Sequence, residues 1–393
     1  MTLSKPLDLF KEFFQSEIAG GLLLICCTLL SLFLANSAAG PSYLHWIHHH
    51  LDLSFANIHL DLSLEQWVND GLMAVFFLLV GLEIERELYK GELRSFKNAL
   101  LPILAATGGM LVPALIHFLF NAGTPYQAGF GIPMATDIAF ALGILSLAGK
   151  KVPVSLKIFL TALAIIDDLG AITVIAIFYT SHFSWAYLAG ALGMFLLLYL
   201  LGKRKFNVLP VYLLGGLIMW YCMLQSGVHA TIAGVLLAFA IPFHQDDKRN
   251  ISYSLQHALH RPAAFIILPL FALANTAIVL PGSMLSGLFT SNSLGIFWGL
   301  FLGKLVGILG LSFLAIRMGW AALPQQVGWR QMTGAALFGG IGFTMSLFIA
   351  NLAFSDPEVV TQSKISILAG SLVSALAGLA VLRLGSTREH GQP

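Results

Sequence analysis

Apolar runs of about 20 residues, separated by short polar segments, follow one another along almost the whole chain. An α-helix needs about 20 mostly apolar residues to cross a bilayer. The pattern therefore predicts an all-α polytopic membrane protein, with residues 1–393 forming a single transmembrane domain of twelve transmembrane helices. The approximate spans are 17–36, 65–82, 97–120, 130–149, 153–179, 183–202, 207–224, 227–242, 258–280, 293–317, 329–354 and 363–384, of which 130–149 and 227–242 have the weakest patterns.

The composition agrees with this interpretation. Hydrophobic residues make up 57% of the chain and charged residues 10%, whereas soluble domains carry about 25% charged residues. No segment outside the apolar runs is long enough to form a soluble domain. The three cysteines lie inside apolar runs without metal-ligand spacing, so we expect them to be small core residues.

The distribution of Lys and Arg predicts the orientation. Of the 21 basic residues, all but Lys304 and Lys364 fall on the side of the membrane that holds both termini. Cytoplasmic loops are enriched in Lys and Arg, so both termini are expected in the cytoplasm. The longest opposite loop, 37–64, has five histidines and no Lys or Arg. It is either a polar, amphipathic loop or a site for a transition metal.

Two adjacent aspartates, Asp167 and Asp168, lie inside the apolar run 160–178. An ionised carboxylate at the centre of a bilayer costs at least about 2.5–3.5 kcal/mol, so such residues are usually functional. Their usual function is to bind and release cations or protons. The pair therefore marks the first candidate site.

Two spans carry signals of a helix break. In the fourth, Pro133 is followed by Thr136 and Asp137, whose side chains could compensate backbone groups freed by the break. In the eleventh, the sequence Gly339-Gly-Ile-Gly342 precedes Thr344 and Ser346. Close helix packing is the alternative explanation for these glycines. Paired interrupted spans are typical of the binding sites of transporters.

Lys304 lies about ten residues from either end of its span, too deep to reach the membrane surface comfortably. It needs a carboxylate partner or must lose its proton. The comparably deep acids are Asp137, Asp167 and Asp168. Successive helix positions differ by about 100°, so one of the adjacent aspartates could pair with Lys304 while the other binds a cation. A static buried ion pair would explain only Lys304 and one aspartate.

The expected chemistry is competition between protons and a small cation. Burial favours the protonated form of a carboxylate, and a second carboxylate nearby favours it further. Carboxylate, hydroxyl and carbonyl oxygens suit hard cations. If such a site opens to one side of the membrane at a time, protons and cations exchange, which is antiport.

Six segments resemble those of the NhaA-type sodium/proton antiporters, and the resemblance runs in order from about residue 10 to 385. Its most specific motifs are Thr136-Asp137 and Asp167-Asp168, and the segments are 74–83, 135–143, 163–171, 226–231, 268–275 and 340–346. The resemblance implies inverted repeats and two discontinuous helices, spans four and eleven, that cross near the membrane midplane. It also implies an electrogenic exchange of two protons for one Na⁺ or Li⁺, which serves pH and sodium homeostasis.

The resemblance also implies roles for individual residues. Asp168 would be the principal cation ligand, with Asp167 beside it and Thr136 nearby, and Lys304 would pair with Asp167 when no cation is bound. Asp137 and Lys304 would offset the dipoles of the half-helices. The charged cluster at 81–94 is either a salt-bridged helix end or a funnel that attracts cations. The resemblance implies that its residues Glu83, Arg86 and Glu87, together with His257, act in the pH response.

One segment departs from the family. His257 and His260 fit its pattern, but Gln256 and Ser254 stand where members often carry a glutamate and a basic residue. We therefore expect a shifted or flatter pH profile. His229 is expected to be a hydrogen-bonded structural histidine.

The remaining expectations follow from the same reasoning. The chain is expected to be a multi-pass protein of the bacterial inner membrane and a homodimer surrounded by lipid, with no cofactor and no nucleic-acid partner. The first alternative function is a sodium-coupled organic-anion symporter of related fold. An intramembrane aspartyl protease is disfavoured because adjacent aspartates cannot face each other as a catalytic dyad, so no enzyme activity is expected.

Overall fold

The structure is a computed structural model that describes residues 5–55, 59–91, 94–149, 152–180, 183–243, 250–280 and 289–384, without the side chains of 5–18, 96, 97 and 384. Five of the basic residues used to predict the orientation lie outside the described residues: Lys150, Lys151, Lys248, Arg249 and Arg388. The chain divides into two compact units. Unit 1 comprises Met1–Leu22, Glu92–Thr173 and Pro281–Pro393, and unit 2 comprises Leu23–Gly91 and Val174–Leu280. The single transmembrane domain stays a prediction.

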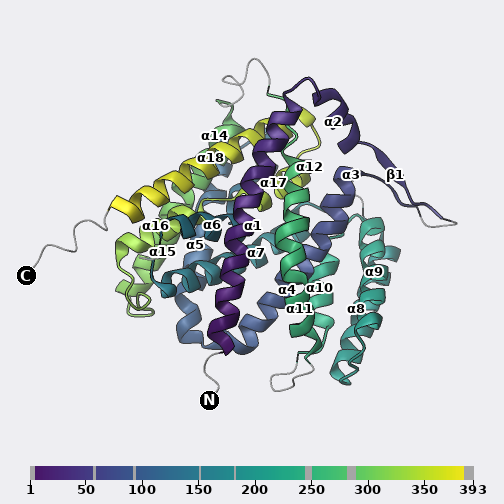
Figure 1. Ribbon diagram of the computed structural model, residues 1–393, viewed down its shortest axis with the longest axis horizontal. Coiled ribbons are helices and arrows are strands. Elements are labelled where there is room, and N and C mark those ends of the chain that lie inside the picture. The colour runs from purple at the N-terminus through teal and green to yellow at the C-terminus, as the bar shows by residue number, and fades with distance from the viewer. Residues whose placement is uncertain are drawn as a thin grey trace, which may run out of the picture. The chain divides into compact units, whose positions relative to one another are not determined.

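The regular secondary structure in the described part of unit 1 consists of helices (Figure 1). It begins with the first residues of α1 (Lys5–Ala35), which continues into unit 2, and it includes most of α7 (Val154–Phe178). Its other elements are α5 (Phe96–Asn121), the 3₁₀ helix η3 (Pro125–Met134), α6 (Ile138–Leu147), α14 (Ser291–Trp298), the π-helix η5 (Gly299–Gly303), α15 (Lys304–Arg317), α16 (Trp329–Gly339), α17 (Phe343–Ala353) and α18 (Pro357–Leu384).

Three glycines at four-residue spacing let α5 approach η5 and α15 closely. A Cβ built on Gly307 would lie 2.1 Å from the carbonyl oxygen of Gly108, and one on Gly303 would lie 2.8 Å from the Cα of Pro113. One on Gly299 would lie 3.3 Å from the carbonyl oxygen of Pro113 in α5 and 2.8 Å from the Cβ of Pro133 in η3. Small residues at helix interfaces are the usual basis of close packing in membranes. This glycine face holds the start of α15, and therefore Lys304, against α5.

Unit 2 contains helices and one small hairpin. The hairpin consists of β1 (His50–Asp52) and β2 (Asp61–Ser63), paired antiparallel with Leu51 opposite Leu62. The helices are α2 (Gly40–Ile47), α3 (Leu64–Gln66), the π-helix η1 (Trp67–Leu72), α4 (Met73–Lys90), α8 (Trp185–Lys203), α9 (Leu209–Ser226), α10 (Ile232–Ala240), α11 (Ile251–Pro262), the π-helix η4 (Ala263–Ile267) and α12 (Leu268–Asn275).

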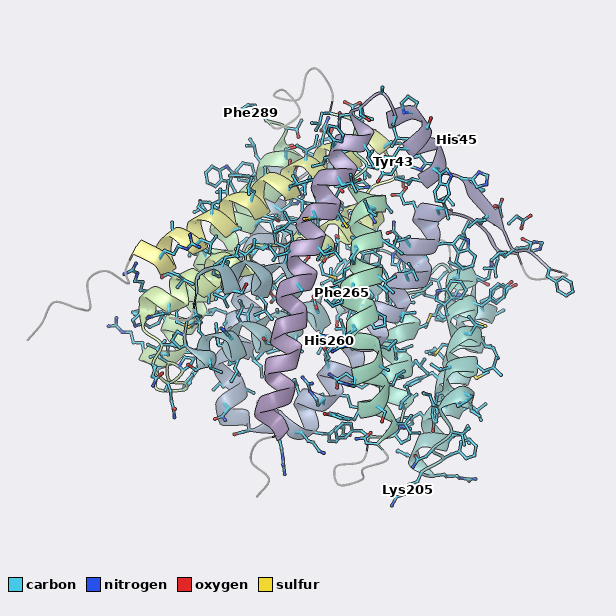
Figure 2. The ribbon with its side chains drawn as sticks, in the orientation of Figure 1. Tyr43, His45, Lys205, His260, Phe265 and Phe289 are labelled. Carbon is cyan, nitrogen blue, oxygen red and sulfur yellow. The ribbon has the colours of Figure 1, made fainter. Side chains whose placement is uncertain are left out.

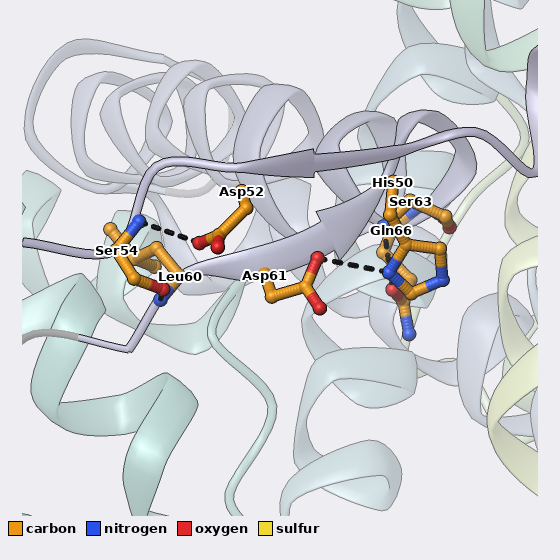
Figure 3. Close-up of polar contacts among 7 residues, drawn as sticks. All are labelled: His50, Asp52, Ser54, Leu60, Asp61, Ser63 and Gln66. Carbon is orange, nitrogen blue, oxygen red and sulfur yellow. Dashed lines mark hydrogen bonds and ion pairs between the residues drawn. The ribbon is translucent and has the colours of Figure 1, made fainter.

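The loop predicted at 37–64 is more ordered than its sequence suggested. Tyr43 of α2 donates to the carbonyl oxygen of Leu273 at 3.0 Å, which ties this short helix to α12; Figure 2 labels Tyr43. In the hairpin, His50 Nδ1 lies 3.0 Å from Asp61 Oδ1 (Figure 3). Among the described residues, no three His, Cys, Asp or Glu side chains form a group that could hold a metal ion, so the transition-metal alternative has no ligand set there.

The described helices establish an all-α polytopic membrane protein. Nine helical segments of the described chain are long and apolar enough to cross a membrane, and two bent pairs raise the number to as many as eleven. One bent pair is η3 and α6, which meet at 50°. Inside the predicted span 227–242, α10 has nine residues, fewer than a bilayer requires. The count of twelve stays a prediction.

Candidate functional site

Two chain segments between helices face each other in unit 1. The backbone is extended at Ala135 and Asp137, between η3 and α6, and residues 340–342 separate α16 from α17. The Asp137 amide donates to the Ile341 carbonyl oxygen at 2.7 Å. The Ser346 hydroxyl donates to the Ile132 carbonyl oxygen at 2.7 Å. Backbone groups that have no partner in their own helix are thus satisfied by the other segment, as a low-dielectric environment requires.

The Asp137 carboxylate lies at the N-termini of two helices. Its Oδ1 accepts from the Phe140 amide at 2.9 Å, which caps α6. Its Oδ2 accepts from the Thr344 amide at 3.0 Å and from the Thr344 hydroxyl at 2.5 Å, in the first turn of α17. Negative charge is stabilised at helix N-termini, so the arrangement explains how an aspartate with 2% exposure is accommodated.

Lys304, the first residue of α15, is completely buried and forms an ion pair with Asp167 of α7. Its Nζ lies 2.5 Å from Asp167 Oδ2 and 3.0 Å from Thr136 Oγ1. The pairing expected for Lys304 is therefore present. A buried ion pair depends strongly on both partners, because loss of one leaves an uncompensated charge.

The Thr136 hydroxyl joins this ion pair to the end of α16. Its oxygen lies 2.7 Å from Asp167 Oδ2 and 2.8 Å from the Gly339 carbonyl oxygen. A hydroxyl carries one proton, so donation to Asp167 and donation to Gly339 are alternatives. The hydroxyl oxygen also accepts from Lys304, which leaves Thr136 fully engaged in either state.

Asp168 is 1% exposed and follows Asp167 directly in α7. Unit 1 thus holds three buried carboxylates and one buried ammonium group, from the segment before α6 and from α7 and α15. The second oxygen of Asp167, Oδ1, is buried and has no hydrogen-bond partner among the described residues. This acceptor, the hydroxyl of Thr136 and the neighbouring Asp168 supply the oxygen-rich environment that a small hard cation prefers.

The residues expected to form the pH-responsive funnel lie in unit 2. Glu83 of α4 is buried, and Gln256 of α11 hydrogen-bonds to its carboxylate. Arg86 Nη2 lies 3.1 Å from Glu87 Oε1. His257 is exposed.

Sequence reasoning missed a second buried acid on α4. Glu85 is 6% exposed and accepts a hydrogen bond from the Ser252 hydroxyl at 3.1 Å. A polar face of α11 could have been predicted from the sequence, because Ser252 and Gln256 are four residues apart and therefore lie on one side of the helix. That face meets the acidic end of α4. His229 has the structural contact expected of it, with Nε2 2.8 Å from the Tyr179 carbonyl oxygen.

Together, these observations define the class: a polytopic helical membrane protein of the transporter type, with a buried cluster of charged side chains inside unit 1. Residues 11–382 match the model of the Na⁺/H⁺ antiporter 1 family. The chain belongs to this family.

Curated relatives cover nearly the whole chain. It is 57% identical over 394 residues to a Na(+)/H(+) antiporter NhaA of Dechloromonas aromatica. The aligned region covers 99% of this chain and 98% of the relative. It is 55% identical over 380 residues to the NhaA of Cytophaga hutchinsonii, with 97% and 96% covered. The NhaA of Flavobacterium psychrophilum is 56% identical over 374 residues, with 95% of each chain covered.

Proposed function

We propose that this protein is an electrogenic antiporter that exports Na⁺ or Li⁺ in exchange for protons. One observation carries the proposal: the buried Lys304–Asp167 ion pair, bridged by Thr136 and adjoining Asp168. Family membership and the names of the relatives support Na⁺/H⁺ exchange.

The binding reaction follows from the contacts. Asp168 is the principal cation ligand, with Asp167 beside it and Thr136 nearby. In the cation-free state, Lys304 neutralises Asp167. An arriving cation competes with the ammonium group for the same carboxylate, so binding breaks the ion pair and releases protons from the site. Two protons per cation make the exchange electrogenic.

Asp137 and Lys304 keep the site electrostatically stable during exchange. Asp137 carries the negative charge at the N-termini of α6 and α17. Lys304 approaches the C-terminal end of α16 through Thr136, which bonds to Gly339. These charges oppose the helix dipoles. The proposed architecture is twelve transmembrane helices with inverted repeats, in which spans four and eleven are discontinuous and cross near the midplane.

The proposal extends to the cellular setting. The protein is a homodimer of the bacterial inner membrane with both termini in the cytoplasm, and it serves pH and sodium homeostasis. Glu83, Arg86, Glu87 and His257 form the pH-responsive funnel. Because Gln256 faces Glu83, we expect a shifted or flatter pH profile. Measured activity with a steep alkaline onset between about pH 6.5 and 9, where a titrating group would act, would contradict this last point.

The primary test is the collapse of a pre-formed pH gradient in everted vesicles after addition of Na⁺, Li⁺ or K⁺. The unmodified chain should respond to Na⁺ and Li⁺ but not to K⁺, and Asp168→Asn should abolish the response. Asp356→Asn is the matched control, because Asp356 is exposed and its contact with the Glu358 amide can be kept by asparagine. A well-expressed chain without any response would refute antiport and favour a sodium-coupled symporter.

Electrogenicity has a separate test. In proteoliposomes, an imposed membrane potential should change the exchange rate. Replacing Lys304 and Asp167 together with neutral residues should abolish this voltage dependence if the pair carries a transported proton. Unchanged voltage dependence in the double variant would show that the pair only stabilises the site.

A further inference from the structure

A buried polar cluster at the C-terminal end of α5 has no role in the proposed exchange reaction. His117 and Asn121 of α5, Asn292 of α14 and Ser363 of α18 are all 0% exposed. His117 Nε2 lies 3.1 Å from Asn292 Oδ1, and Asn292 Nδ2 donates to Ser363 Oγ at 2.8 Å. Buried polar groups are retained at a cost when apolar residues would fill the same space, so the cluster requires an explanation.

The donor in each hydrogen bond of this series can be assigned by starting from Ser363, whose partner is a backbone carbonyl. Ser363 Oγ donates to the carbonyl oxygen of Val359, which can only accept. Ser363 therefore accepts from the Asn292 amide, and Asn292 presents its oxygen to His117. Since that oxygen cannot donate, His117 must carry its proton on Nε2.

Asn121 does not alter this assignment. Its amide nitrogen donates to the carbonyl oxygens of His117 at 2.9 Å and of Ser291 at 3.2 Å, which uses both N–H groups. His117 Nδ1 is then a bare acceptor, buried and without a hydrogen-bond partner in the described chain. The side chains that the ring contacts through hydrogen bonds are neutral. A proton added at Nδ1 would be buried without an acceptor, which favours the neutral ring.

Two glycines fit the ring closely. A Cβ on Gly129 of η3 would lie 3.0 Å from His117 Cε1, and one on Gly295 of α14 would lie 3.0 Å from His117 Cδ2. The imidazole is therefore held between η3 and α14. The 3₁₀ helix η3 has ten residues, whereas 3₁₀ helices longer than three or four residues are uncommon because their hydrogen bonds are poor. Such a segment depends on packing from outside.

We propose that His117 is a positioning residue for transport: its neutral, Nε2-protonated ring supports η3, the segment that leads directly to Thr136 and Asp137. Residue 129 and the site residues belong to one short stretch of chain, so a displacement of η3 moves the Thr136 hydroxyl relative to Asp167 and Lys304. This inference rests on the proposed antiport. It predicts that a change at His117 alters cation affinity although the ring does not contact the site.

Transport kinetics of four variants in proteoliposomes test the positioning role. His117→Phe keeps a ring but removes the donor, and we expect the apparent KM for Na⁺ to rise about fivefold, the factor equivalent to roughly 1 kcal/mol. His117→Gln places an amide donor near the Nε2 position and should restore a KM near that of the unmodified chain. Asn292→Leu should resemble His117→Phe, and the double variant should be no worse than either, because both remove one interaction.

Thermal stability and ¹⁵N NMR separate the outcomes. If His117→Phe lowers thermal stability but leaves KM unchanged, the ring only fills space and the proposal is overturned. In protein labelled with ¹⁵N-histidine, His117 should show a protonated Nε2 and an unprotonated Nδ1 at every pH from about 5 to 8, the range in which histidines usually titrate. A protonated Nδ1 would overturn the assignment. A chain that exchanges no cation would refute the antiport itself, while the NMR result would still report on the tautomer.

Discussion

Substituting Gly307 by alanine tests whether close approach of α5 and α15 sets the position of Lys304. A Cβ at Gly307 would lie 2.1 Å from the Gly108 carbonyl oxygen and 2.6 Å from its carbon, whereas a Cβ at Gly310 on the same helix would have nothing within 4 Å. Real Cβ atoms do not approach a backbone oxygen closer than about 3 Å, because atomic cores repel steeply. The backbones must therefore separate by about 1 Å.

The magnitude comes from comparing the two variants. Glycine to alanine in a helix gains up to about 1 kcal/mol in helix propensity at either position. Overpacking costs typically about 1–3 kcal/mol and applies to Gly307 alone. The difference between Gly307→Ala and Gly310→Ala should therefore be about 1–3 kcal/mol in favour of Gly310→Ala, since the propensity gain is shared.

Thermal denaturation in detergent and Na⁺ titration of exchange measure the effect. Gly307→Ala should be less thermostable than Gly310→Ala, and its apparent KM for Na⁺ should rise because Lys304 lies one turn away on the displaced helix. Gly310→Ala should match or exceed the unmodified chain in stability. Equal stability and equal KM for the two variants would refute the claim that this contact positions Lys304.

Two further predictions concern the ion pair. Lys304→Met should lower the free energy of unfolding by about 3–5 kcal/mol, because it leaves a buried charge uncompensated, and adding Asp167→Asn should restore much of the loss; a double variant less stable than the single, by thermal denaturation, would contradict this. Thr136→Val should raise the apparent KM for Na⁺ about fivefold through loss of one hydroxyl hydrogen bond, worth roughly 1 kcal/mol, while Thr136→Ser should stay near the unmodified value. Equal KM values for Val and Ser would show that the hydroxyl does not contribute.

The charged residues of the site could be predicted from the sequence, because a charge inside an apolar run is costly in a membrane. Asp137, Asp167, Asp168 and Lys304 stand out for that reason alone, and Pro133 marks where the fourth predicted span bends. The residues alone left the partner of Lys304 open among three aspartates. The resemblance implied Asp167, and the structure places it at 2.5 Å. Helix periodicity gives the face of a residue but not the helix that this face meets.

The same limit explains what was missed. Glu85 with Ser252, and His117 with Asn292, are contacts between residues more than 160 positions apart in the chain. Helix periodicity places Ser252 and Gln256 on one face of α11, but neither pairing can be predicted from local sequence, because each depends on how helices pack. The ordered helix α2 and the hairpin escaped prediction for a different reason: both are short, and their apolar pattern is brief.

The two-sided capping by Asp137 has a mechanical consequence. One carboxylate group accepts hydrogen bonds from the first turns of both α6 and α17, and the Asp137 amide bonds to the Ile341 carbonyl oxygen just before α17. Neither helix can slide or rotate about this point without breaking buried hydrogen bonds. The junction between the starts of α6 and α17 therefore behaves as a single rigid joint, and any force that displaces α17 is transmitted directly to α6.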